Sequence, residues 1–61
     1  MCEFIVYLDG KKVMEDVVYA HTDSDKVTIK DIIGESKTFE GVRLVEVNVI
    51  STSLIIESEL K

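Results

Sequence analysis

Proline and tryptophan are absent from this sequence, glycine occurs three times, and cysteine and histidine occur once each, as Cys2 and His21. With one cysteine the chain cannot form an internal disulfide, and one cysteine with one histidine cannot complete a closed four-ligand zinc site. No apolar run approaches the roughly 20 residues of a membrane-spanning helix, and Glu3 interrupts any signal-peptide core. We therefore expect a soluble protein that is, by default, cytoplasmic and makes no membrane contact.

Basic residues are scarce. Seven lysines and arginines stand against 12 aspartates and glutamates, which gives a net charge of -5. Affinity for nucleic acid depends on cationic side chains that displace counterions from phosphates, and this chain has few. The aromatic residues are not interleaved with basic ones, so we interpret them as core and hairpin-pair residues: Phe4, Tyr7, Tyr19 and Phe39. We do not expect a nucleic-acid partner.

At 61 residues, the chain has the size of one small domain, which we place over residues 1–61. A domain of this length buries only about 60% of the surface of its unfolded chain. Because disulfides and a structural metal cluster are excluded, oligomerisation is the remaining usual source of stability. Hydrophobic residues make up 46% of the chain, many of them aliphatic, so we expect a homodimer that covers surplus apolar surface.

The amino-terminal segment carries the clearest strand pattern. One face of an extended segment would hold the apolar residues Cys2, Phe4, Val6 and Leu8. Asp9-Gly10 follows, and both residues tolerate the positive φ of a type I′ hairpin turn. The second strand should therefore start near Lys12 and pair with the first.

Further along, the apolar alternation changes parity where two adjacent valines follow Asp16, so we expect a bulge or bend there. A short helical turn that ends at Gly34 should bury Ile32 and Ile33. Further strands are expected at residues 18–21, 27–30, 37–40, 42–50 and 54–57. This spacing predicts an all-β fold, either a small SH3-like barrel, preferred over an OB-fold, or a strongly bent antiparallel sheet of about six short strands, homodimeric in both cases.

Cys2 has two interpretations. As a small apolar residue at the end of the first stripe, it would belong to the core, since free cysteines are among the most buried residue types. As a metal ligand, it lies close to the terminal amine. If Met1 is removed, the thiolate and α-amine of Cys2 form one chelate ring; if Met1 is retained, its backbone amine, the Cys2 amide nitrogen and the thiolate form two fused rings. Such donors suit square-planar Ni(II) or Cu(II), and two chains at a two-fold axis would complete the plane.

Several segments resemble the CooT family of small proteins, which includes nickel-binding accessory proteins of carbon monoxide dehydrogenase. The similar segments are the opening Met-Cys, Val6-Tyr7-Leu8, residues 14–17, residues 27–35 and the final apolar strand. The resemblance implies a small β-rich homodimer in which Cys2 is the nickel ligand. It also implies a nickel enzyme such as carbon monoxide dehydrogenase, or its accessory proteins, as partner. The family has also been described as RNA-binding, which the charge of this chain does not favour.

Catalysis has no support, because the spacing gives His21 no serine or cysteine partner and the glycines are too scattered for a phosphate-binding loop. Two functions compete. The first is a metallochaperone-like protein, not an enzyme, that binds one Ni(II) per homodimer through Cys2 with or without the Met1 amine. The second is a metal-free β module that binds another protein through an apolar groove or a sheet edge. Assistance to the metal from His21 or Glu3 stays open.

The charge balance yields the first testable prediction. At physiological salt, a mobility-shift assay with single-stranded RNA should detect no binding, because few lysines can neutralise phosphates at once. Tight, salt-sensitive binding would contradict this prediction. A local basic face is the arrangement that would produce it, built from Lys11, Lys12, Lys30, Lys37 and Arg43.

Overall fold

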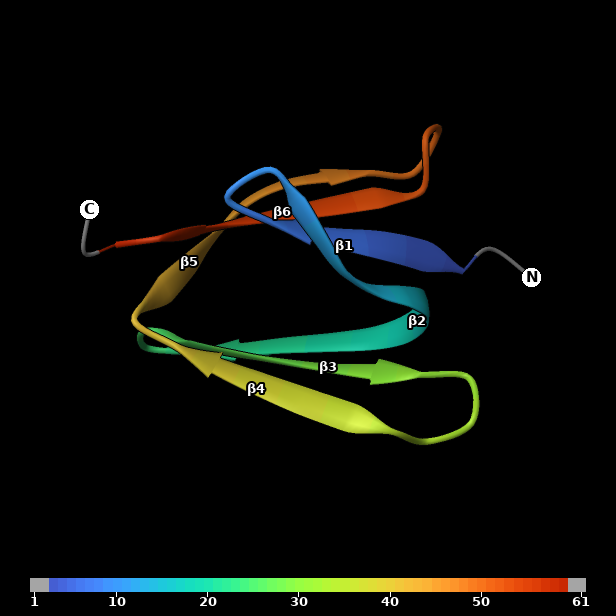
Figure 1. Cartoon of the computed structure of the whole chain (residues 1–61), viewed down its shortest axis with the longest axis horizontal. Helices are drawn as coiled ribbons and strands as arrows, with labels where there is room; N and C mark the ends of the chain where they lie inside the picture. Colours follow the sequence, from blue (N-terminus) through green and yellow to red (C-terminus); the bar gives the residue numbers. More distant parts are fainter. Residues whose placement is uncertain (1–2, 60–61) are drawn as a thin grey trace.

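The computed structural model describes residues 3–59, which form six strands in one sheet and no helix. In chain order the strands are β1 (Phe4–Leu8), β2 (Lys11–Asp23), β3 (Lys26–Asp31), β4 (Ser36–Glu40), β5 (Val42–Asn48) and β6 (Ser53–Ser58). The order across the sheet is β4-β3-β2-β1-β6-β5 (Figure 1). The predicted all-β class and the predicted number of strands are confirmed.

Two details of the predicted architecture are wrong. The sheet is not closed into a barrel, because its edge strands β4 and β5 follow each other in the chain without pairing in the described residues. The sheet is also not wholly antiparallel, because β1 and β6 run parallel with Val6 opposite Leu54. The strongly bent sheet is the alternative that applies, with β1, β6 and β5 above and most of β2, β3 and β4 below (Figure 1).

β2 belongs to both parts of the bent sheet. Its first half pairs with β1 and its second half pairs with β3, and the register shifts in both ladders near residue 17. Asp16 has a φ of 59°, a left-handed value that bends the strand at this point. Val17 then pairs with Phe4 of β1 and with Asp31 of β3. The predicted bend near Asp16 is confirmed.

The core lies between the two parts of the sheet. It consists of aliphatic side chains from all strands but β4: Val6, Val17, Val27, Ile29, Val42, Leu54 and Ile56. Partly buried neighbours pack against it: Phe4, Leu8, Val13, Met14 and Phe39. Val6 comes from the predicted apolar stripe of the first strand, and in β6 the half-buried Ile55 lies between the buried Leu54 and Ile56. The period-2 pattern therefore identified the inward face of β1 correctly.

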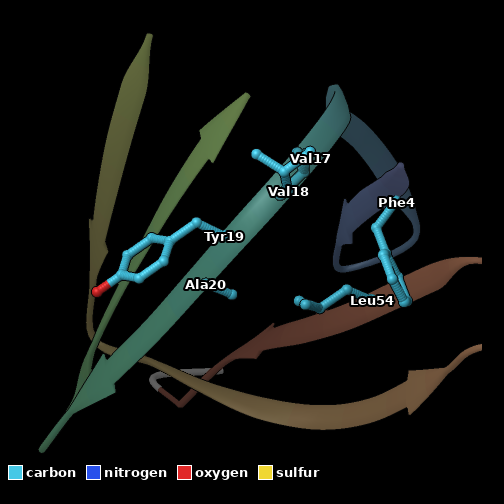
Figure 2. A pocket seen from close by; sticks show the side chains of 6 residues that line it. All are labelled: Phe4, Val17, Val18, Tyr19, Ala20 and Leu54. Atoms are coloured by element: carbon cyan, nitrogen blue, oxygen red, sulfur yellow. The ribbon is translucent and has the colours of Figure 1, made fainter. Parts of the chain in front are cut away.

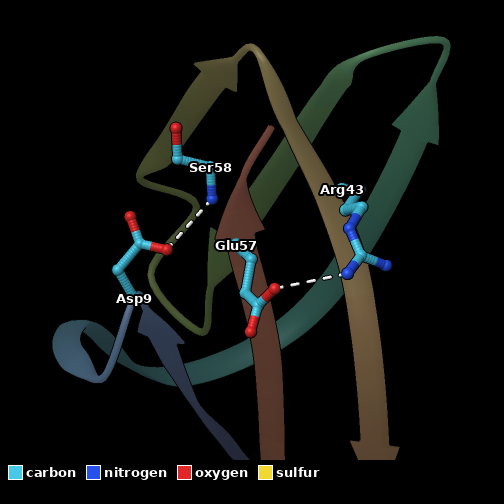
Figure 3. Close-up of polar contacts among 4 residues, drawn as sticks. All are labelled: Asp9, Arg43, Glu57 and Ser58. Carbon is cyan, nitrogen blue, oxygen red and sulfur yellow. Dashed lines mark hydrogen bonds and ion pairs between the residues drawn. The ribbon is translucent and has the colours of Figure 1, made fainter. Parts of the chain in front are cut away.

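The turn between β1 and β2 is fixed by backbone conformation and by one side chain. Asp9 and Gly10 have φ values of 51° and 86°, as predicted for this hairpin. The Asp9 carboxylate accepts a hydrogen bond from the backbone N–H of Ser58 at 3.1 Å (Figure 3). The backbone N–H of Asp9 donates to the carbonyl of Ile56 at 3.1 Å. The turn is thus tied to β6, which also carries the surface ion pair of Glu57 with Arg43 at 3.3 Å (Figure 3).

The turn between β3 and β4 departs from expectation. Ile32 and Ile33 are both exposed, so the predicted burial of these isoleucines is wrong. The Asp31 carboxylate accepts hydrogen bonds from the N–H groups of Ile33 and Glu35 at 3.1 and 2.9 Å. Because the side chain of Asp31 satisfies the backbone locally, the turn keeps its shape without burying its apolar residues. Gly34, with a φ of 92°, does end this turn.

The geometry of Asp9 leads to a prediction about stability. Asp9→Ala should lower the free energy of unfolding by about 1–2 kcal/mol, because the variant loses the bond to Ser58 and places alanine at a positive φ. Urea unfolding followed by circular dichroism measures this change. Asp23→Ala removes the same charge from the exposed end of β2 and should stay within about 0.5 kcal/mol of the parent. Equal losses in both variants would contradict the role given to Asp9.

Candidate functional site

The chain enters the sheet between β2 and the turn that follows β5. The predicted metal ligands Cys2 and Met1 lie outside the described residues, which begin at the half-buried Glu3. Phe4 pairs with Val17 of β2, and the N–H of Ile5 donates to the carbonyl of Thr52 at 2.9 Å. The segment that leads to the predicted ligands is therefore fixed on both sides from residue 4 onward.

An apolar groove opens directly beside this entry point. Its volume is about 130 Å³, and its lining comes from β1, β2 and β6: Phe4, Val17, Val18, Tyr19, Ala20 and Leu54. Figure 2 shows Phe4 and Leu54 on one side of the groove and Ala20 of β2 on the other. Phe4 belongs to the same alternating stripe as Cys2 in the sequence, so the groove adjoins the side of β1 that this stripe occupies.

A second, smaller hollow continues the first toward β5. It is lined by Ala20, His21, Thr22, Val27 and Leu44, and Ala20 lines both hollows. Leu44 lies opposite the buried Ile56, and Val47 lies opposite Leu54, so both residues of β5 are on the core side of the sheet. Both are nevertheless exposed, whereas Val42 at the start of β5 is buried.

We call this side of the sheet the open face. It combines the lining of the two hollows with the uncovered residues of β5, and its apolar members are Phe4, Val18, Ala20, Leu44, Val47 and Leu54. Single exposed aliphatic residues are ordinary, whereas a contiguous set on one face marks an interaction surface. The sequence predicted surplus aliphatic surface but not its position, because position depends on the sheet staying open.

Glu3 and His21, whose assistance to the metal was left open, lie at different distances from the point where the chain enters the sheet. Glu3 directly precedes β1 and is thus at the entry point. His21 pairs with Thr28, four residues along β2 from Val17, which corresponds to about 13 Å of extended strand. The histidine is therefore distant from the end where Phe4 meets β2. Within residues 3–59, no three side chains of His, Cys, Asp or Glu are grouped as a metal site.

Three of the five cations that would form a basic face have partners within the chain. Arg43 pairs with Glu57 on β5 and β6, while the Lys37 ammonium donates to the carbonyl of Val13 at 3.3 Å. Lys12 forms an ion pair with Glu15 at 3.2 Å.

The described part of the chain contains no helix with the length and apolar character needed to cross a bilayer.

These features define a class: small, strongly bent six-stranded β proteins with an apolar open face beside the amino-terminal end. The model of the CooT family, described as CO dehydrogenase accessory protein CooT, matches residues 1–57, and the chain belongs to this family. The predicted family is thereby confirmed, and membership implies an accessory role in the CO dehydrogenase system. An uncharacterised protein of Methanocaldococcus jannaschii is 37% identical over 49 residues, which cover 79% of this chain and 86% of that protein.

Proposed function

We propose that this protein is a nickel-binding accessory protein of the metallochaperone type, in which Cys2 binds one Ni(II) per homodimer. The observation that carries the proposal is the family match over residues 1–57, which includes Cys2, the one cysteine of the chain. A thiolate is the softest donor that a protein offers and favours late first-row metals such as nickel. The proposed role is binding and delivery of the metal rather than catalysis.

The remaining ligands in this proposal are backbone nitrogens. One chain supplies the Cys2 thiolate with either its own α-amine or the Cys2 amide and the Met1 amine, depending on whether Met1 is removed. One chain therefore offers at most three donors, so a second chain related by a two-fold axis completes the square plane. The distance of His21 from the entry point, about 13 Å along β2, supports a site without this imidazole.

The open face supports the dimer in this proposal. It includes Phe4, so a second copy packed against it would bring two amino termini toward one another. A chain of 61 residues also gains from such packing, because its own core contains few fully buried side chains. The nickel enzyme of the family description, CO dehydrogenase, or its accessory proteins would receive the metal from this dimer.

A metal-free interaction module is the alternative, and the open face is the observation that favours it. In that case the apolar groove binds another protein, and Cys2 is one more apolar residue of the first stripe. The two functions differ in what a Cys2 substitution does. They therefore can be separated by metal titration together with thermal unfolding.

Cys2→Ser should leave the protein folded and lower its Ni(II) affinity by orders of magnitude, because serine keeps the size of the side chain but removes the thiolate. Calorimetric titration should give one Ni(II) per two chains in the parent, with thiolate-to-nickel charge-transfer absorption. Affinity should also fall below neutral pH, since the thiol and the amine must lose protons to bind.

His21→Ala is the matched control and should titrate like the parent. Equal nickel affinity in the parent, Cys2→Ser and His21→Ala would refute the metallochaperone function. The interaction-module alternative expects a different pattern, in which Cys2→Ser lowers the melting temperature because a hydroxyl replaces an apolar thiol, and weak metal binding stays unchanged.

The dimer has its own prediction. Ala20→Glu puts a charge at the point where both hollows of the open face meet, and Ala20 is already exposed, so the fold should tolerate the change. The parent should sediment as a dimer at micromolar concentration and the variant as a monomer, because burying an unpaired carboxylate at an interface is unfavourable. Ser36→Glu adds the same charge opposite Lys30, on the other face of the sheet, and should remain dimeric. A monomeric parent would exclude the dimer.

A further inference from the structure

Two turns expose aliphatic side chains to an unusual degree. In the turn after β3, Ile32 and Ile33 are exposed, with 81% of Ile33 accessible. In the turn after β5, Val49 and Ile50 are exposed, with 99% of Ile50 accessible. We call these four residues the apolar tips. They are separate from the open face, whose exposed residues lie within strands.

Both turns lie at the same end of the molecule. The N–H of Ile32 donates to the carbonyl of Asp16 at 3.0 Å, which joins the first turn to the bend of β2. The N–H of Ile5 donates to the carbonyl of Thr52, which joins the second turn to β1. Figure 1 shows both turns at the right-hand end, one above and one below, with the start of β1 and the bend of β2 between them; the β2–β3 and β4–β5 turns lie at the opposite end.

Local hydrogen bonds hold both turns in shape. Besides the bonds to Asp31 in the first turn, the N–H of Ser51 donates to the side-chain oxygen of Asn48 at 3.0 Å in the second. The hydroxyl of Thr52 donates to the carbonyl of Ser51 at 2.7 Å. A partner that binds preshaped turns loses less conformational entropy than one that must order them, so the apolar tips are suited to act as anchors.

The charge at this end is acidic. Glu3, Asp16 and Glu35 come from the segments that meet there, and none of their carboxylates forms an ion pair within residues 3–59. The neighbouring cations are engaged: Lys30 lies 5.2 Å from the centre of the Tyr19 ring, and Lys37 donates to Val13. A partner surface that carries lysine or arginine would be complementary to these carboxylates.

We infer that the end formed by the apolar tips docks a protein surface that combines an apolar patch with lysine or arginine side chains. The isoleucines of the two turns pack against the patch, and Glu3, Asp16 and Glu35 meet the cations around it. The inference goes beyond the nickel proposal and does not depend on it, because it rests on side chains of residues 3–59 alone.

The test uses the full chain with isotopic labelling and a defined probe, an amphipathic peptide of leucine and lysine spaced at the helical period. NMR titration should show the largest shift changes at residues 31–35 and 48–52. A peptide with glutamate in place of lysine should produce none. Shift changes confined to the open face, or equal binding of both peptides, would overturn the inference.

Two variants separate the apolar and the charged contributions. Ile33→Ser combined with Ile50→Ser should weaken binding of the leucine–lysine peptide at least about tenfold, because two anchors are lost. Asp16→Asn combined with Glu35→Gln should weaken it several-fold and reduce its salt dependence, and asparagine tolerates the positive φ at position 16. Val45→Ser, an exposed aliphatic site on β5 outside both turns, should bind like the parent.

Two further measurements test whether the apolar tips instead contact a second copy of the chain or a lipid membrane. Sedimentation of the Ile33→Ser, Ile50→Ser variant should give the same mass as the parent, and a lower mass would show instead that the tips contact a second copy. Flotation with vesicles of zwitterionic or anionic lipid should leave the parent unbound, and binding through the tips would replace the protein partner by a membrane. Nickel titration of the same double variant should match the parent, so a failed peptide titration refutes this inference while leaving the nickel proposal to its own test.

Discussion

A straight strand of 13 residues would span about 40 Å, which exceeds the 33 Å length of the whole molecule. β2 therefore has to bend, and the left-handed conformation of Asp16 provides the bend. Immediately after it, Val17 pairs with β1 on one side and β3 on the other. The two parts of the sheet fold over each other about this point, and the core fills the space between them. Without the bend, β1 and β3 would lie in one flat sheet with a single apolar face left uncovered.

The same geometry explains why one face stays open. β4 and β5 follow each other through Gly41, and the N–H of Val42 donates to the carbonyl of Asp25 at 3.0 Å, so the two parts of the sheet meet at that end. From there β5 leaves β4 and follows β6 to the opposite end. Leu44 and Val47 consequently face the core side and stay exposed. An apolar groove at the opposite end is the direct result of closing the sheet at one end only.

Features with a local cause were predictable from the sequence. Asp9-Gly10 specifies a hairpin through its own conformational preference, and the parity change after Asp16 locates the bend. The parallel pairing of β1 with β6 has no such signature, because it depends on the path of the intervening chain. The exposure of Ile32 and Ile33 was also not predicted. The sequence pattern shows only that these residues are apolar. In the structure, the Asp31 carboxylate accepts the hydrogen bonds of the turn's backbone N–H groups, so the turn keeps its shape without burying the isoleucines.

The candidate metal ligand was identified from the sequence rather than from the fold. Cys2 was identified from chemistry and position in the sequence, and the fold of residues 3–59 shows where the chain enters the sheet: at Phe4, beside the apolar groove and at the acidic end with the apolar tips. The buried core of the described residues is entirely aliphatic and contains no potential metal ligand. A core of this kind does not depend on a metal for its packing, unlike that of a zinc finger, where metal binding supplies the folding free energy. Loading and release of an ion at the amino terminus would then leave the sheet intact, which is the property that a carrier requires.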